Sequence, residues 1–330
     1  MTDTAALLLL PRLRVQNANA ISGPLSWGFP APTAFTGFVH ALERQLRPQV
    51  AVSFGGVGIV CHRFDPQVLA PPGRRHQVLR LTRNPIFAGW KKFEDKAAAI
   101  VEEGRAHLEV SLLIQVRTEL DEDEREALLQ AVLPTVHAMR LAGGSLQPGY
   151  DQRQKPVWQE WYTAAKDNTE AFRKLKRRLL PGFALVQRDD LLAQRLTEWR
   201  QEPEDAHGDA LDALLDLTRL NFQPVGPDPK NPAETLWELR TKPGWLVPLP
   251  VGYAALSSLY PPGAVRGARD NQTPFRFVET LYSLGQWISP HRLPELSAIL
   301  WQPEADTEAG LYRCTNRFAD TLPTTPADHL

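Results

Sequence analysis

The chain has 330 residues, 43% of them hydrophobic, which is enough for one large domain or two ordinary ones around a real core. Its formal net charge of −1 argues against binding of nucleic acid through bulk electrostatics alone. The longest apolar run, residues 5–10, is far shorter than the roughly 20 residues that span a bilayer, and no charged segment precedes it as in a secretory signal, so we expect a soluble, cytoplasmic protein.

The first predicted elements are a strand, a helix and a second strand. Residues 5–16 predict the first strand. Residues 33–46 predict a helix, because their apolar side chains fall on one face at helical spacing. These side chains are Phe35, Phe38, Val39, Leu42 and Leu46. Residues 52–64 are rich in β-branched side chains and predict a second strand, with a bulge or a close approach at its central glycines, Gly55, Gly56 and Gly58.

The next elements complete a recognisable order. An irregular stretch, residues 65–104, precedes a segment at 106–117 whose alternation predicts a third strand with one buried and one largely polar face. Residues 121–137 predict an acidic helix, and "MRLAGGSL" at 139–146 predicts a fourth strand. The order βαββαβ indicates an α+β fold with a ferredoxin-like or RRM core over residues 1–150 and a long insertion between its second and third strands.

Residues 151–330 predict an additional region of mixed α/β structure. Charged helices are expected at 163–176 and 188–200, and short strands with turns at 237–253, where Trp, Val and Pro alternate. The loop "RGARDNQTPFRFVE" combines three arginines with two amides, which suits RNA recognition by shape and base edges. The alternative is a turn in which Arg269 and Asp270 form a weak surface ion pair.

Charge is strongly segregated along the chain. Residues 173–178 and 74–83 are basic, whereas residues 119–126 and 202–212 are acidic. A single cluster of this kind is usually a solvated face. Several separate basic clusters in a near-neutral chain suggest one polyanion-binding surface and other surfaces that face partners.

The end of the first strand carries polar side chains. Alternation places Leu13 and Val15 on the helix side of the sheet and Arg12, Arg14 and Gln16 on the open side, where an RRM binds RNA. The amides that follow can contact base edges, and the stiff loop after them offers an aromatic for stacking. Alternatively, the amides only cap the turn and the start of the helix.

The sequence resembles the Csy2 family, the Cas5-type (RAMP) subunit of the type I-F CRISPR surveillance complex, also called the Csy complex or Cascade. The resemblance rests on long strings such as "LLLLPRLRVQNANAISGPLSWGFPAPTAFTGFVHALERQ", "KPGWLVPLPVGYAALSSLYPPG" and "ARDNQTPFRFVETLYSLGQWISPHRL". It covers nearly the whole chain and is weakest at residues 147–172 and 223–234. Those segments could carry partner contacts particular to this protein.

The resemblance implies a non-catalytic, RNA-binding role in antiviral defence. Such a subunit holds the 5′ handle of CRISPR RNA together with the large subunit, caps the backbone of repeated subunits, and supports guide-directed recognition of foreign DNA. A thumb-like insertion contacts the adjacent backbone subunit, which makes residues 65–104 the candidate thumb. Residues 151–330 would complete the RNA site and bind the large subunit, and target DNA is a further possible partner.

We expect the RNA contacts mainly on the first strand and the loop after it, at Arg12, Arg14, Gln16, Asn17, Asn19 and Trp27. Secondary candidates are Arg140, Ser145, Arg177, Arg178, Arg266, Arg269 and Arg276. The candidate thumb contributes cations for phosphates and an aromatic side chain for wedging, at Arg74, Arg75, Arg80, Arg83, Trp90, Lys91 and Lys92.

An alternative function is that of a metal-independent RAMP endoribonuclease that processes CRISPR RNA. Such an enzyme needs a general base, most often a histidine, and the candidates are His40, His62 and His107. No hydrolase, zinc-protease or phosphate-loop motif is present, and the two cysteines, Cys61 and Cys314, lack metal-binding spacing. We therefore expect no enzymatic activity, metal or cofactor. A scaffold that contacts only protein is a third possibility, against which the basic clusters argue.

Overall fold

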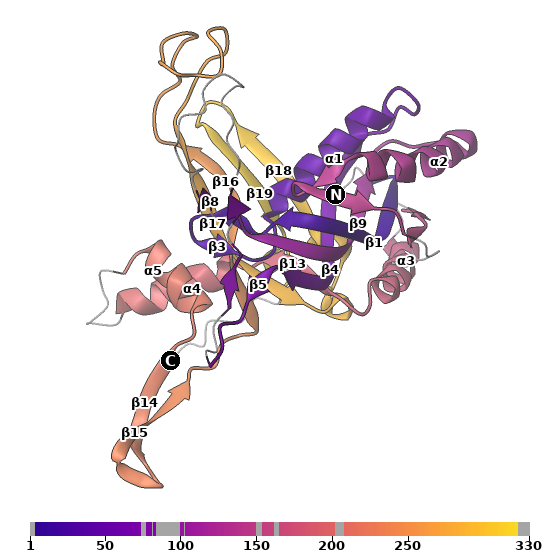
Figure 1. Ribbon diagram of the computed structural model, residues 1–330. Coiled ribbons are helices and arrows are strands. Elements are labelled where there is room, and N and C mark those ends of the chain that lie inside the picture. Colours follow the sequence, from indigo (N-terminus) through magenta and orange to yellow (C-terminus); the bar gives the residue numbers. More distant parts are fainter. Residues whose placement is uncertain are drawn as a thin grey trace. The chain divides into compact units, whose positions relative to one another are not determined.

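A computed structural model describes residues 4–73, 77–80, 82–83, 100–101, 103–149, 154–161, 165–201 and 208–322. The chain divides into two compact units, Met1–Gly182 and Phe183–Leu330, and each contains an antiparallel sheet with helices (Figure 1). The boundary predicted at residue 150 therefore lies inside the first unit. The physical reason is a long-range pairing, because β12 (Val157–Glu160) is antiparallel to the start of β1 (Ala6–Asn19).

The sheet of the first unit has the strand order β11-β1-β9-β4, with antiparallel neighbours throughout. Its remaining strands are β4 (Phe54–Pro66), β9 (Arg105–Val116), β10 (Arg140–Leu141) and β11 (Gly144–Gln147). The segment predicted as one fourth strand is thus a tight hairpin of two strands. Its turn residues, Ala142 and Gly143, both have positive φ, as a two-residue hairpin turn requires.

Helices α1 (Pro32–Leu46) and α2 (Glu122–Ala138) lie side by side and contact strands of this sheet (Figure 1). The apolar face predicted for α1 is confirmed, because all five of its predicted side chains are buried. The acidic start of α2 forms a capping box, in which Asp121 accepts from the Glu124 N–H and the Glu124 carboxylate accepts from the Asp121 N–H. The third helix, α3 (Ala165–Arg178), ends in a basic turn.

The prediction of a half-polar third strand is correct only for its first half. In β9, residues 105–110 alternate as expected, but Ser111, Leu113 and Gln115 are buried as well. Both buried polar side chains have partners within the unit. Ser111 binds His62, and Gln115 donates to Thr4 and accepts from Gly56 N–H. The open polar face is therefore restricted to one end of the sheet.

The predicted irregularity of the second strand is also confirmed. The register between β4 and β9 shifts between Phe54 and Val57, so a bulge lies at Gly55 and Gly56. A Cβ at Gly55 would collide with the end of the Gln115 side chain, so this side chain approaches the backbone closely at Gly55.

The first unit also contains three short two-stranded ribbons among its described residues, two of them inside the predicted thumb. These are β2 (Ile21–Gly23) with β3 (Ser26–Trp27), β5 (Val68–Leu69) with β6 (Val78–Leu79), and β7 (Thr82–Arg83) with β8 (Ile100–Val101).

The second unit contains an antiparallel sheet with the order β13-β17-β16-β19-β18. Its strands are β13 (Phe183–Gln187), β16 (Trp245–Ala255), β17 (Val278–Ile288), β18 (Leu300–Asp306) and β19 (Leu311–Asn316). Two helices, α4 (Asp189–Gln201) and α5 (Ala210–Thr218), contact β17 and β16 respectively. A separate ribbon is formed by β14 (Phe222–Asp228) and β15 (Asn231–Leu239), and short 3-10 turns lie at 290–292, 296–298 and 319–321. None of the described helices combines the length and the apolar content that a membrane span requires.

Candidate nucleic-acid interface

Two bulges shape the strand on which most of the predicted contacts lie. The pairing of β1 with β9 shifts register between Leu10 and Leu13, and again between Val15 and Ala18. Arg12 and Asn17 lie in these bulges with φ of 54° and 59°. The left-handed conformation costs a non-glycine residue about 1–2 kcal/mol, and a bulge turns side chains away from their regular direction. The polar end of β1 is thus a locally strained segment.

Arg12 is held by internal contacts. Its guanidinium donates to Glu109 at 2.9 Å and to the carbonyls of Leu180 and Pro181 at 3.1 and 3.4 Å, and its backbone N–H donates to Ser111 Oγ at 3.0 Å. Only 23% of its side chain is exposed. The structure therefore places this predicted RNA contact in a position that fastens residues 180–181 to the sheet.

His62 reinforces the same fastening. Its Nδ1 lies 2.6 Å from the Pro181 carbonyl, and its Nε2 lies 2.7 Å from Ser111 Oγ. A Cβ at Gly182 would lie 2.6 Å from His62 Nδ1, so the chain passes closely over the ring. Burial lowers the pKa of His62 and favours the neutral ring, which donates to the carbonyl and accepts from the Ser111 hydroxyl.

Arg14 and Gln16 occupy the open surface as predicted. Both are exposed, and the register places Arg14 beside Gln147 of β11 and Gln16 beside Ser145. Gln147 Nε2 donates to Gln16 Oε1 at 3.2 Å. The fold thus brings the predicted Ser145 next to the predicted first-strand residues and adds Gln147, which the sequence analysis did not single out. Arg140, on β10, pairs with Ser145 and donates to the Gly143 carbonyl.

Asn17 belongs to a small polar cluster with Gln67 and His107. Gln67 Nε2 donates to Asn17 Oδ1 at 2.6 Å, and the Asn17 N–H donates to His107 Nδ1 at 3.4 Å. Arg105 reaches the Asn17 carbonyl at 3.5 Å and also pairs with Glu103. Gln67 and Arg105 carry no sequence signal of their own, because only the pairing of β9 with β1 and with β4 brings them beside Asn17.

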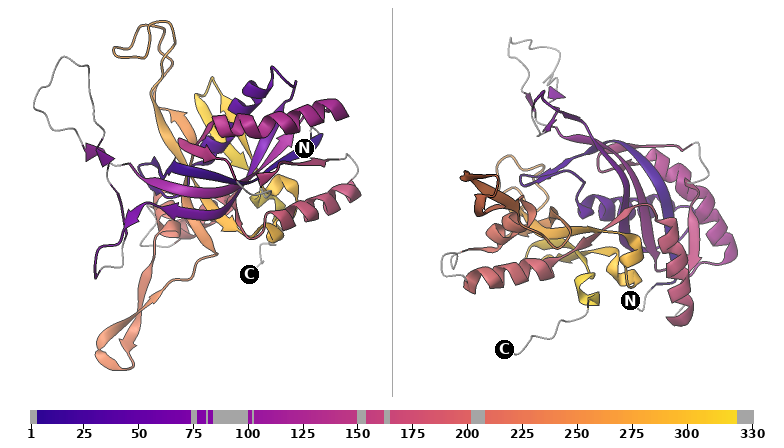
Figure 2. Two further views of the ribbon diagram at one scale, coloured as in Figure 1. Left: turned by 45° about the vertical axis from the view of Figure 1, so that its right-hand side comes forward. Right: turned by 90° about the horizontal axis from the view of Figure 1, so that it is seen from below.

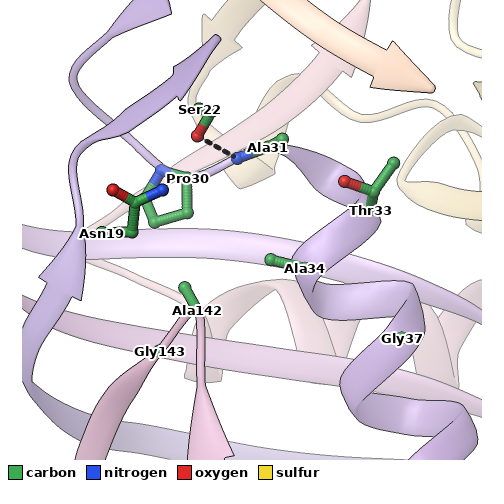
Figure 3. Close-up of a pocket in the computed structure, with 9 residues that line it drawn as sticks. All are labelled: Asn19, Ser22, Pro30, Ala31, Thr33, Ala34, Gly37, Ala142 and Gly143. Carbon is green, nitrogen blue, oxygen red and sulfur yellow. Dashed lines mark hydrogen bonds between the residues drawn. The ribbon is translucent and has the colours of Figure 1, made fainter. Parts of the chain in front are cut away.

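Asn19 has a local role, which agrees with the alternative interpretation of the amides. Its side chain donates to the Ile21 carbonyl at 2.7 Å and accepts from the Ile21 N–H at 3.1 Å. Figure 3 shows Asn19 at the rim of a pocket of about 530 Å³ beside the start of α1. In the same pocket the Ser22 hydroxyl accepts from the Ala31 N–H at 3.1 Å.

A basic groove lies beside Arg12. It has a volume of about 730 Å³, and its polar lining includes Lys155, Arg177 and Arg178. All three cationic residues are exposed, and the two arginines end α3, where positive charge suits the helix dipole. Trp158 forms part of the wall. The predicted Arg177 and Arg178 are thus joined by Lys155, which lies in a segment where the family resemblance is weak.

Trp27 lines a third hollow, of about 880 Å³, at the base of the predicted thumb. The ring is half exposed, and Phe64, Leu69 and Arg80 line the same hollow. Arg83 lies on β7. The other candidate thumb residues, Arg74, Arg75, Trp90, Lys91 and Lys92, lie outside the described residues.

The remaining candidates belong to the second unit. Arg266 and Arg269 are exposed. Asp270 accepts from the backbone N–H groups of Gln272 and Thr273, and these hydrogen bonds lower its pKa. Arg276 donates to the Thr307 carbonyl at 3.3 Å.

The histidines of the nuclease hypothesis occupy three different settings. His40 is exposed on α1, His62 binds Ser111 and a carbonyl, and His107 binds Asn17 and Gln67. Among the residues that the structure describes, no three His, Cys, Asp or Glu side chains are grouped so as to hold a metal ion.

Comparison with known proteins places the chain in a family. The family model described as CRISPR-associated protein (Cas_Csy2) matches residues 8–314. The chain is similar to CRISPR-associated protein Csy2 of Pseudomonas aeruginosa (strain UCBPP-PA14), with 51% identity over 328 residues that cover 97% of this chain and 98% of that protein. The resemblance seen in the sequence is therefore confirmed, and the chain belongs to the Csy2 family of CRISPR-associated proteins.

Proposed function

We propose that the chain is a non-catalytic subunit of the type I-F Csy complex that binds the 5′ handle of CRISPR RNA. In this role it acts with the large subunit, caps the backbone of repeated subunits, and supports recognition of foreign DNA by the guide. Membership of the Csy2 family supports the assignment of the chain to the Csy complex. The polar end of the first sheet supports RNA as the ligand.

A ferredoxin-like or RRM core belongs to this proposal. The order β11-β1-β9-β4, with one helix after β1 and another after β9, supports this core, because a βαββαβ sheet is expected to have the same order. RRM sheets bind RNA on the face that their helices leave open. A polar row on neighbouring strands of such a sheet consists of the exposed Arg14, Gln16 and Gln147 and the half-buried Ser145, and this row is the observation that carries the proposal.

The side chains in this region suit a single-stranded RNA. Arg14 supplies a planar cation for phosphate, and the amides donate and accept toward base edges. Lys155, Arg177 and Arg178 extend the positive charge along the groove beside Arg12. Trp27 offers a half-exposed ring on which a base can stack. In the second unit, Arg266 and Arg269 would add contacts of their own.

The test is a gel-shift titration of labelled handle RNA, with a scrambled RNA as control. The chain is assayed alone and with the large subunit. The double variant Arg14→Ala/Gln16→Ala should weaken handle binding about tenfold or more, as expected for the loss of an arginine contact. Arg44→Ala removes the same charge from an exposed position on α1 and should leave binding unchanged. Equal binding of both RNAs, or cleavage of the RNA on the same gel, would contradict the proposal.

A further inference from the structure

The ribbon β14–β15 projects from the second unit and pairs with none of the other described strands (Figures 1 and 2). Two-stranded ribbons are marginally stable in water unless they pack against something else. This ribbon nevertheless presents large apolar side chains to solvent. Phe222 is 60% exposed, Trp237 58% and Leu239 50%. Such exposed clusters mark binding surfaces.

The register gathers these side chains on one face. Phe222 lies opposite Leu239, and Pro224 lies opposite Trp237. Cross-strand partners point to the same side, and residues two apart along a strand share that side. The pair between them, Gln223 and Glu238, therefore points to the other face. Next to the base of the ribbon, one face is therefore apolar and the other polar. Beyond the register shift between Pro224 and Gly226, the second face also carries Leu236, which is 36% exposed.

The charge of the ribbon indicates the class of partner. Residues 222–239 contain Asp228, Glu234 and Glu238 against Lys230, which gives a net charge of −2. This sign repels a phosphate backbone and favours a protein surface with basic side chains. Apolar anchors such as tryptophan and phenylalanine are typical of protein interfaces.

The base of the ribbon is fixed to α5. Asn221, just before β14, donates to Asp216 Oδ1 at 2.7 Å, and Arg240, just after β15, donates to Asp216 Oδ2 at 2.7 Å. Lys242 donates to the carbonyls of Asp216 and Leu217. Both ends of the ribbon are thus tied to the end of one helix, which reduces the entropy lost when the ribbon binds.

We propose that the β14–β15 ribbon is a docking arm for another protein subunit of the complex, which receives Phe222, Trp237 and Leu239 in an apolar groove rimmed by basic side chains. The inference rests on the proposed function, because that function supplies the neighbouring subunits. It extends that function by assigning a protein contact to a surface separate from the RNA-binding row.

The test measures binding of the purified chain to the large subunit and to the backbone subunit, each without RNA. Phe222→Asp and Trp237→Asp add a charge to the apolar face, whereas Gln223→Asp adds the same charge to the opposite face. One of the two subunits should bind wild type and Gln223→Asp equally and should bind the two apolar-face variants roughly 30-fold more weakly, the effect of losing a hot-spot aromatic. Glu234→Lys should weaken the same binding several-fold and reduce its salt dependence.

Equal binding of all variants to both subunits would overturn the docking arm, as would a wild-type chain that binds neither subunit. Unchanged thermal midpoints confirm that the exposed substitutions leave the fold intact. The same variants are titrated with handle RNA. Loss of RNA binding in Trp237→Asp would assign the apolar face to nucleic acid. Dissociation of a dimer of this chain by Trp237→Asp would assign the face to a second copy. Either result would overturn the proposal of a docking arm. A wild-type chain that binds a protein subunit but no handle RNA would contradict the proposed function alone.

Discussion

Asp216 is a buried acid whose neutralisation should destabilise the second unit. It is 3% exposed and accepts from Arg195 Nε at 2.8 Å, Arg240 Nη2 at 2.7 Å and Asn221 Nδ2 at 2.7 Å. The substitution Asp216→Asn keeps the shape and removes the charge. Arg195, with only 13% of its side chain exposed, would then lose its main counter-charge.

The expected loss follows from this burial. Removal of one partner from a buried ion pair costs about 3–5 kcal/mol, and we expect the lower end, about 3 kcal/mol, because the Arg240 side chain is one-third exposed and regains water. For a unit of this size 1 kcal/mol shifts the melting midpoint by about 2–4 °C, so Asp216→Asn should melt about 6–12 °C below wild type.

The pH dependence provides a second readout. Burial by itself would raise the pKa of Asp216, but hydrogen bonds from Arg240 and Arg195 outweigh it and hold the pKa below its ordinary value of 3.8. A depressed pKa in the folded state means that the stabilisation is complete above the ordinary value and is lost as the pH falls through the folded value. The difference between wild type and Asp216→Asn should therefore be constant from about pH 7 to about pH 5 and shrink below about pH 4.

The assay is circular dichroism during heating across this pH range. Glu238→Gln neutralises an exposed acid and serves as the control, with a midpoint near that of wild type. A midpoint for Asp216→Asn within about 2 °C of wild type at pH 7 would refute the reasoning, as would a difference that persists unchanged in strong acid.

Three further predictions concern the first unit. Arg12→Ala should lower the thermal midpoint by several degrees, because its ion pair and two carbonyl contacts are lost, whereas Arg14→Ala should leave the midpoint unchanged. Wild type should lose stability as the pH falls below about 6.5, since burial disfavours the protonated His62 ring only in the folded state. His62→Gln should not show this loss. Burial raises the pKa of the Cys61 thiol to about 12, so Ellman's reagent should react with it far more slowly in the folded chain than in urea.

Equal midpoints for Arg12→Ala and Arg14→Ala would contradict the internal role of Arg12. If His62→Gln lost stability with falling pH as steeply as wild type, the burial of the neutral His62 ring would not explain that pH dependence. Rapid labelling of Cys61 in the folded chain at pH 8 would show that its thiol is accessible and ionised.

Local patterns in the sequence predicted the elements that depend on local physics. The spacing of Phe35, Val39 and Leu42 predicted the buried face of α1, and the acids at residues 121–124 predicted the start of α2. The glycines at 55–56 indicated the bulge of β4. In each case the determining interaction lies within a few residues of chain or in a single strand.

Features that depend on contacts between distant segments could not be predicted from the sequence. Alternation placed Arg12 on the open face, but it could not show that Glu109 and the carbonyls of Leu180 and Pro181, far along the chain, hold its side chain. The boundary at 150 followed the end of the predicted fourth strand, whereas the pairing of residues 157–160 with β1 extends the first unit to 182. Residues 223–234 gave no strand pattern because four prolines interrupt them, and the ribbon in which they lie pairs with none of the other described strands.

The central position of β1 has a consequence for synthesis of the chain. Its neighbours, β9, β11 and β12, all lie between residues 105 and 160, so β1 leaves the ribosome long before the strands that pair with it. At about 5–20 residues per second, the apolar run at residues 6–10 waits on the order of 10 s for its partners. During that interval it is an unpaired, hydrophobic strand. We therefore expect folding of the first unit to be limited by long-range strand pairing and chaperones to bind the nascent chain at its first strand.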